Sequence, residues 1–132
     1  MLAFAISLPL LLPGFLTGTF AGWNPVILLV YGPLKAITQE LFFRCTVLPV
    51  FLRLFRRRLW LPIFLAALVH GLWHVGPLSL GQPWFAVLSV MAVPFLGGLA
   101  WNWQVQHDRT ALWVTIYHIL IDQGVSLFTW GS

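Results

Sequence analysis

Three pairs of charged or imidazole side chains stand four residues apart in stretches of sequence that are otherwise apolar. The pairs are Glu40 and Arg44 in "QELFFR", His70 and His74 in "HGLWH", and His118 and Asp122 in "HILID". Residues four apart lie on one face of an α-helix, separated by about 6 Å along its axis. Each stretch therefore predicts a helix that carries one polar stripe on an apolar surface.

Such stripes are expected to face a shared interior, because a charged side chain in contact with lipid costs several kcal/mol unless it finds a partner. Two imidazoles and a carboxylate in one dry cavity are suitable ligands for a divalent metal, and Zn²⁺ is the usual choice for nitrogen and oxygen ligands. A water bound to that metal loses its proton near neutral pH and becomes a nucleophile, with a neighbouring carboxylate to accept the proton. The residue types thus indicate a hydrolytic metal site.

A structural interpretation of the same residues stays open. Glu40 and Arg44 can neutralise each other within one helix, and a lone His70 is more often a hydrogen-bonding residue at a helix contact than a ligand. For His74, and for His118 with Asp122, we favour a function. An ionisable residue in an apolar helix costs free energy, so residues of this kind on separate helices are expected to have a function.

The composition predicts that these helices cross a membrane. Hydrophobic residues make up 60% of the 132 residues and charged residues only 8%, whereas an average soluble domain has roughly 25% charged residues. Several apolar runs reach the roughly 20 residues that cross a bilayer core. We expect an all-α membrane protein of one domain, residues 1–132, built as a bundle of about five transmembrane helices. The expected helices cover 2–22, 36–53, 59–76, 84–102 and 111–130, and 23–33 is expected to be a short re-entrant or interfacial segment.

Most of the positive charge lies in one loop. Arg53, Arg56, Arg57 and Arg58 fall within "RLFRRR", between two apolar spans. By the positive-inside rule this loop is cytoplasmic, and so is the amino terminus. The loop-poor chain suggests the cytoplasmic membrane of a prokaryote, with membrane lipids as partners. Nucleic acid is not expected as a partner, because no aromatic and basic polar surface accompanies the run. The single cysteine, Cys45, excludes an intrachain disulfide and a cysteine metal cluster.

The three motifs resemble the sequence signatures of the CPBP family of intramembrane metalloproteases, also called the Abi or type II CAAX prenyl endopeptidase family. Those signatures are Glu-Glu-x-x-x-Arg, Phe-x-x-x-His and His-x-x-x-Asn or Asp, in this order on successive membrane helices. The resemblance covers about residues 36–126. It implies a helical bundle like the core of that fold, and hydrolysis of a membrane-associated peptide by a metal-activated water. It implies catalytic roles for Glu40, Arg44, His74, His118 and Asp122, and zinc or another divalent metal on His74, His118 and Asp122.

Two positions depart from that pattern. Gln39 stands where the family has its first Glu, the residue thought to activate the water, and His70 stands where it has Phe. A carboxamide cannot act as a general base near neutral pH. Three outcomes are open: Glu40 takes over the role after a local distortion, His70 adds a ligand or a base, or the site is inactive.

An inactive site suggests a different class of function. The chain would then be a non-catalytic accessory or scaffold subunit of a larger membrane complex, held beside other membrane subunits. A pigment or haem complex is one such case, in which a histidine of an apolar helix is an axial ligand. Buried carboxylates and histidines also occur in transporters and proton relays. The sequence shows no internal repeat, which argues against an ordinary secondary transporter.

Overall fold

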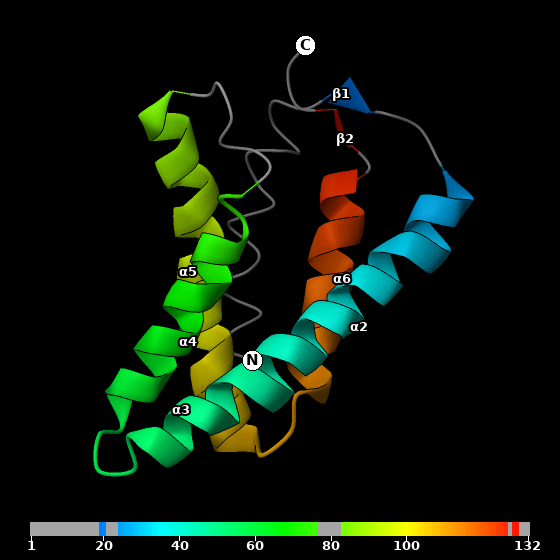
Figure 1. Ribbon diagram of the computed structural model, residues 1–132. Coiled ribbons are helices and arrows are strands. Elements are labelled where there is room, and N and C mark those ends of the chain that lie inside the picture. Colours follow the sequence, from blue (N-terminus) through cyan, green and yellow to red (C-terminus); the bar gives the residue numbers. More distant parts are fainter. Residues whose placement is uncertain (1–18, 21–23, 77–82, 127, 130–132) are drawn as a thin grey trace.

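The computed structural model describes residues 19–20, 24–76, 83–126 and 128–129 of the 132-residue chain. Nearly all of these residues are helical (Figure 1), which confirms the expected helical fold. The elements are β1 (Thr19–Phe20), η1 (Ile27–Tyr31), α2 (Gly32–Phe42), η2 (Phe43–Val47), α3 (Leu48–Leu54), α4 (Trp60–Trp73), α5 (Trp84–Asp108), α6 (Leu112–Ser126) and β2 (Phe128–Thr129). The first expected helix, 2–22, lies outside the described residues except at β1.

The segments η1, α2, η2 and α3 form one helical rod without a break (Figure 1). In the π-helical turns η1 and η2, the N–H groups that close the turn, at Gly32 and Leu48, bond to carbonyls five residues earlier. A proline follows each closing residue, at Pro33 and Pro49. Because proline lacks an N–H group and crowds the preceding turn, a wider turn lets the helix continue. The expectation of a separate segment at 23–33 is therefore wrong, since residues from 27 onward belong to the rod.

Helix α4 packs along α5, and α2 packs along α6 (Figure 1). Two glycines allow α4 and α5 to approach closely. A Cβ atom at Gly71 would lie 2.9 Å from the carbonyl oxygen of Met91, and one at Gly98 would lie 3.2 Å from the Cα atom of Ala67. Small residues of this kind let two helix backbones pack against each other. The close approach brings the histidines of α4 beside α5.

Helix α5 runs beyond its expected end at residue 102. Its last turn is held by a hydrogen bond of 3.0 Å from Gln104 Nε2 to Asp108 Oδ2, and the chain leaves the helix through Arg109 in the left-handed conformation, with φ of 58°. A left-handed residue commonly ends a helix in this way. Within the described ranges, no helix combines the length and the apolar content needed to cross a membrane.

The last expected helix, 111–130, ends earlier than predicted. Helix α6 stops at Ser126, and two residues later β2 pairs antiparallel with β1, so that Thr129 lies opposite Thr19 and Phe128 lies opposite Phe20. The prediction that this helix extends to residue 130 is therefore wrong at Phe128 and Thr129, which form β2. Phenylalanine and threonine favour strands, but a two-residue strand is too short to show an alternating pattern in sequence.

Among the described residues, several polar side chains are buried in the interior of the fold, and many large apolar side chains are exposed on its surface. The largest fully buried side chains include Glu40, Arg44 and His70. Exposed apolar side chains occur on every long helix and include Leu29, Tyr31, Leu41, Phe64, Trp84, Leu96 and Trp113. The polar stripes therefore face the interior, as the sequence predicts.

Candidate functional site

Glu40 and Arg44 are the centre of the polar interior. Glu40 lies near the end of α2, and Arg44 follows in the π-helical turn η2, so the two remain on one face of the rod. Their side chains are 1% and 2% exposed, and Arg44 Nε lies 3.1 Å from Glu40 Oε2. A buried charge is tolerated only when it is paired. The pair predicted from the four-residue spacing is thus formed within one helical rod.

Glu40 also reaches the third motif. Its Oε1 accepts a hydrogen bond of 2.7 Å from Nδ1 of His118, which lies on α6 and is buried. A carboxylate can only accept, so the proton of the imidazole is on Nδ1 and the Nε2 atom is left as an acceptor. Helix packing between α2 and α6 therefore joins two motifs that are 78 positions apart in the sequence.

His70 joins the second motif to the same centre. Its Nδ1 lies 3.5 Å from Arg44 Nη2, and the ring is only 1% exposed. Arginine can only donate, so Nδ1 of His70 is the acceptor and Nε2 carries the proton in the neutral ring. This buried Nε2 has no partner in good hydrogen-bonding geometry among the described residues, although the backbone carbonyl of Pro94 on α5 lies close enough to interact with the ring. The ring packs against Phe43, with centroids 4.6 Å apart.

His74 is the residue at which α4 ends. Its Nδ1 donates to the carbonyl oxygen of His70 at 2.9 Å, across one helical turn. This bond leaves Nε2 of the neutral ring as an acceptor. The two histidines of α4 therefore differ in role, because His70 has a buried donor and His74 has a half-buried acceptor.

Asp122 lies one helical turn after His118 on α6. Its Oδ1 is 3.7 Å from Nε2 of His118, which is an ion-pair distance rather than a hydrogen bond. Its Oδ2 is 3.1 Å from Nζ of Lys35 on α2. Lys35 was not predicted to belong to the site, although it is the single lysine of the chain and stands in an apolar stretch. That isolation is the signal that could have identified it.

These side chains open onto one pocket of about 450 Å³. Its polar lining residues are Lys35, His70, His74, His118 and Asp122, and its aliphatic ones are Val90, Val93, Pro94, Gly97 and Ile121. Trp101 of α5 also lines the pocket, with its ring centroid 5.0 Å from that of His118 and 5.7 Å from Cζ of Arg44. Nothing in the sequence distinguishes Trp101 from the other seven tryptophans.

The three motifs meet in a single cluster, in the helix order that their resemblance implies. A family model described as type II CAAX prenyl endopeptidase Rce1-like matches residues 21–123. The chain belongs to the Rce1-like family. The match contains every residue of the pocket and confirms the resemblance predicted from the motifs. Comparisons with curated proteins and with solved structures gave no match.

The resemblance leads us to expect a Glu at the position of Gln39, and the structure limits how a neighbouring residue could take over its role. Gln39 is half-buried on α2, and its Oε1 has no hydrogen-bond partner among the described residues. Glu40 has both carboxylate oxygens engaged, by Arg44 and by His118. Moving Glu40 into the position of Gln39 would therefore leave two buried partners without their carboxylate.

Two histidines of the Rce1-like site have the hydrogen bonding that is common in metal ligands. His74 and His118 each bond through Nδ1 to an oxygen and leave Nε2 available, as metal-binding histidines usually do. Asp122, the expected third ligand, is paired with Lys35. No group of three or more His, Cys, Asp or Glu side chains suited to a metal ion occurs in the part of the chain that the structure describes. The site thus offers two imidazole donors without a third ligand gathered beside them.

Proposed function

We propose that this Rce1-like chain is a membrane-embedded endopeptidase that hydrolyses a peptide bond of a membrane-associated peptide. His118 is the general base in this proposal, and Glu40 orients it. The supporting observation is the buried hydrogen bond of 2.7 Å from His118 Nδ1 to Glu40 Oε1. A carboxylate that accepts from Nδ1 fixes the tautomer in which Nε2 can take a proton, as in hydrolases that pair a histidine with a carboxylate.

The proposed reaction begins with a water in the pocket. Nε2 of His118 takes a proton from this water while the water oxygen attacks the carbonyl carbon of the peptide. The imidazolium lies between Glu40 and Asp122, whose Oδ1 is 3.7 Å from Nε2. The proton then passes from Nε2 to the leaving amine as the C–N bond breaks. Arg44 holds Glu40 in position through its ion pair of 3.1 Å.

His70 is proposed to bind the carbonyl oxygen of the substrate. His70 lines the pocket, and its buried Nε2–H group has only the nearby carbonyl of Pro94 to interact with. A donor that turns to the substrate would stabilise the negative charge that develops on an oxygen during acyl transfer. The contact of Arg44 with Nδ1 holds the ring in the tautomer that donates from Nε2. This role gives a physical reason for histidine where the family motif has phenylalanine.

The substrate is proposed to be a peptide that carries an apolar or lipid-modified residue. The pocket of about 450 Å³ is lined by aliphatic side chains as well as by the polar cluster. Pockets that bind small ligands combine an apolar lining with a few polar groups in this way. The description of the matching family as a prenyl endopeptidase agrees with such a substrate.

The membrane location is part of the proposal. Large apolar side chains are exposed on every long helix, while Glu40, Arg44 and His70 are buried. A soluble protein would leave such apolar surface in contact with water, at a cost that grows with its area. With the arginine-rich turn in the cytoplasm, the amino terminus is proposed to be cytoplasmic as well.

A second candidate function is supported by Gln39. If the family's first carboxylate is needed for chemistry, its replacement by a carboxamide leaves a chain that binds a partner in the membrane without cleaving it. The exposed apolar faces of its helices would then contact other subunits of a membrane complex. This candidate predicts a stable partner that copurifies with the chain.

A cleavage assay separates the two candidates. The full chain, reconstituted in lipid, is incubated with an internally quenched peptide that carries a prenylated cysteine. We expect cleavage by the wild-type chain and a loss of at least about a hundredfold in His118→Gln, because general base catalysis contributes at least that much. His107→Gln is the matched control, since His107 is exposed and lies outside the pocket. A folded wild-type chain that leaves the peptide intact and copurifies with a partner would support the second candidate.

A further inference from the structure

The turn between α3 and α4 concentrates positive charge at one end of the molecule. Arg53, Arg56, Arg57 and Arg58 line a surface pocket of about 350 Å³, together with Leu54 and Phe55. The turn has a defined backbone. Phe55 N–H donates to the carbonyl of Phe51 at 2.9 Å, and Arg58 N–H donates to that of Phe55 at 2.8 Å. The arginines are therefore held close together by the fold as well as by the sequence.

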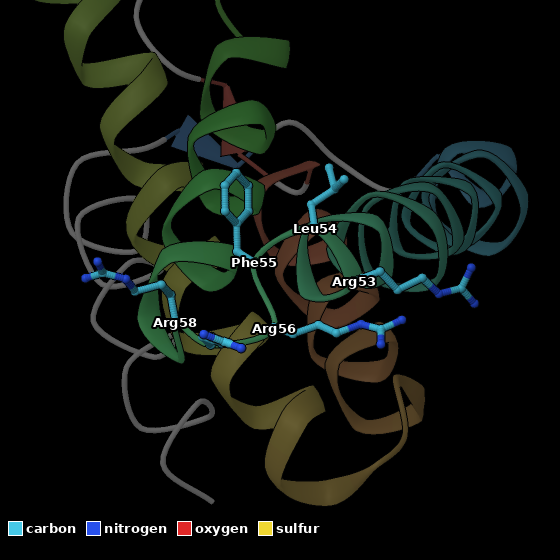
Figure 2. Close-up of a pocket in the computed structure, with 6 residues that line it drawn as sticks. Arg53, Leu54, Phe55, Arg56 and Arg58 are labelled. Carbon is cyan, nitrogen blue, oxygen red and sulfur yellow. The ribbon is translucent and has the colours of Figure 1, made fainter.

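The arginine side chains project away from the helices. Figure 2 shows Arg53 and Arg56 extended to one side of the turn and Arg58 to the other, with Leu54 and Phe55 pointing in a third direction. Several guanidinium groups around one pocket present donors that suit a phosphate, because arginine binds phosphate oxygens in a bidentate manner. A single phosphate group fits within a pocket of this size.

The charge of this turn is not neutralised within the described structure. The chain has three acidic side chains, and all three are described. Glu40 pairs with Arg44 and His118, Asp122 pairs with Lys35, and Asp108 accepts hydrogen bonds from His107 and Gln104. The hydrogen bond from His107, followed by that from Gln104, lowers the pKa of Asp108. Each carboxylate is thus engaged elsewhere, and the counter-charge of the turn has to come from another molecule.

Apolar side chains border the arginines. Leu54, Leu59 and Trp60 are 68%, 70% and 62% exposed, and they flank the turn at the end of α3 and the start of α4. Arginine beside exposed tryptophan and leucine is the combination found where a protein meets a membrane surface, with the ring at the headgroup level and the aliphatic residues below it. A nucleic acid would leave these leucines in water.

We infer that this arginine turn is a binding site for the phosphate headgroups of anionic membrane lipids. Arg53 and Arg56 bind phosphate oxygens, while Arg57 and Arg58 add to the attraction for a negatively charged lipid surface. Trp60 and the two leucines insert beside the headgroups. The inference is independent of the catalytic proposal, because it uses none of the side chains of the pocket between α4, α5 and α6.

The test measures lipid binding to the full chain in a neutral detergent. The probes are short-chain phosphatidylglycerol, phosphatidylcholine of the same chain length, inorganic phosphate and a single-stranded oligouridylate. We expect phosphatidylglycerol to bind at least tenfold more tightly than any of the other three. The triple variant Arg56→Gln, Arg57→Gln and Arg58→Gln should weaken that binding about a hundredfold, since each basic residue near an anionic surface contributes about a fivefold factor.

Two control variants make the test specific. Arg109→Gln removes an exposed arginine from a different connection and should change binding less than twofold. Replacing the same three arginines of the turn by lysine keeps the charge but loses the bidentate contacts of Arg56, so it should restore the affinity only in part. The inference is overturned if the triple glutamine variant binds phosphatidylglycerol as tightly as the wild-type chain does. It is also overturned if Arg109→Gln lowers the affinity by the same factor as each arginine removed from the turn. Tighter binding of the oligonucleotide, or equal binding of inorganic phosphate, would also overturn it.

Discussion

Glu40 of α2 and His118 of α6 are joined by a hydrogen bond of 2.7 Å inside the helix cluster. The same carboxylate pairs with Arg44 at 3.1 Å, and Arg44 in turn lies 3.5 Å from His70. One buried carboxylate thus links the three motifs of the sequence. Because each of its oxygens has a charged or polar partner, the geometry of Glu40 agrees with the positioning role proposed for it better than with direct activation of water.

The first prediction concerns the stability of this buried pair. Arg44→Met alone should lower the free energy of unfolding by about 3–5 kcal/mol, because it leaves the carboxylate of Glu40 buried beside His118 only. The double variant Glu40→Gln with Arg44→Met removes both charges and should be more stable than Arg44→Met. Thermal unfolding in detergent measures both effects. A double variant that is less stable than either single variant would contradict the prediction.

The polar pairs of the site could be predicted from the sequence because helical geometry alone fixes them. Residues four apart share a helix face, and charge avoids an apolar surface, so Glu40 with Arg44 and His118 with Asp122 had to face the interior. Which pairs meet depends on helix packing over long distances in the sequence. The hydrogen bond between Glu40 and His118 and the pairing of Asp122 with Lys35 follow from that packing. The periodicity of the sequence does not indicate these long-range contacts.

The helical class was predictable in the same way, but the ends and joins of the elements were not. The apolar pattern predicts helices, and these are present. The expected helix 36–53 includes Pro49, as the helical rod of the structure does, whereas the expected separation of 23–33 is removed by the π-helical turn η1, which carries the helix into Pro33. The pairing of β1 with β2 joins residues near the two ends of the described chain, and two-residue strands leave no signal in sequence.

The second prediction concerns Gln39. If His118 is the base, then Gln39→Glu should change the rate of peptide cleavage less than about tenfold, because the added carboxylate is not the group that accepts the proton. The control is Gln106→Glu, at a half-buried position of α5 that does not line the pocket. An increase of about a hundredfold or more in Gln39→Glu alone would show that the family's first carboxylate is the base.

The third prediction concerns metal binding. The sequence predicts a zinc or other divalent-metal site on His74, His118 and Asp122, and the structure offers Nε2 of both histidines as donors. A metal on Nε2 of His118 would stop that atom from accepting a proton, so the proposed general base predicts well below one zinc per chain in elemental analysis of the purified full chain. Close to one zinc per chain, lost in His74→Ala and in His118→Ala, would instead support a metal-activated water. His107→Ala is the control, since His107 is exposed outside the pocket. Zinc content that is unchanged in both site variants would exclude these ligands.

The fourth prediction tests the packing that holds His70. A Cβ atom at Gly98 would lie 3.1 Å from Nδ1 of His70 and 3.3 Å from Cβ of Ala67, whereas one at Gly97 meets nothing within 4 Å. Gly98→Ala should therefore displace the His70 ring and lower the free energy of unfolding by about 1–3 kcal/mol. Gly97→Ala should be neutral or stabilising, because alanine favours a helix by about 0.5–1 kcal/mol over glycine.

The same pair of variants separates packing from chemistry. In Gly98→Ala the displaced ring loses its contact with Arg44 and can no longer direct Nε2–H into the pocket, so peptide cleavage should fall along with stability. The measurements are thermal unfolding and the cleavage rate, made on both variants at one temperature well below unfolding. Equal stability and equal activity in the two alanine variants would show that α4 and α5 do not pack through Gly98 and that His70 is not held there.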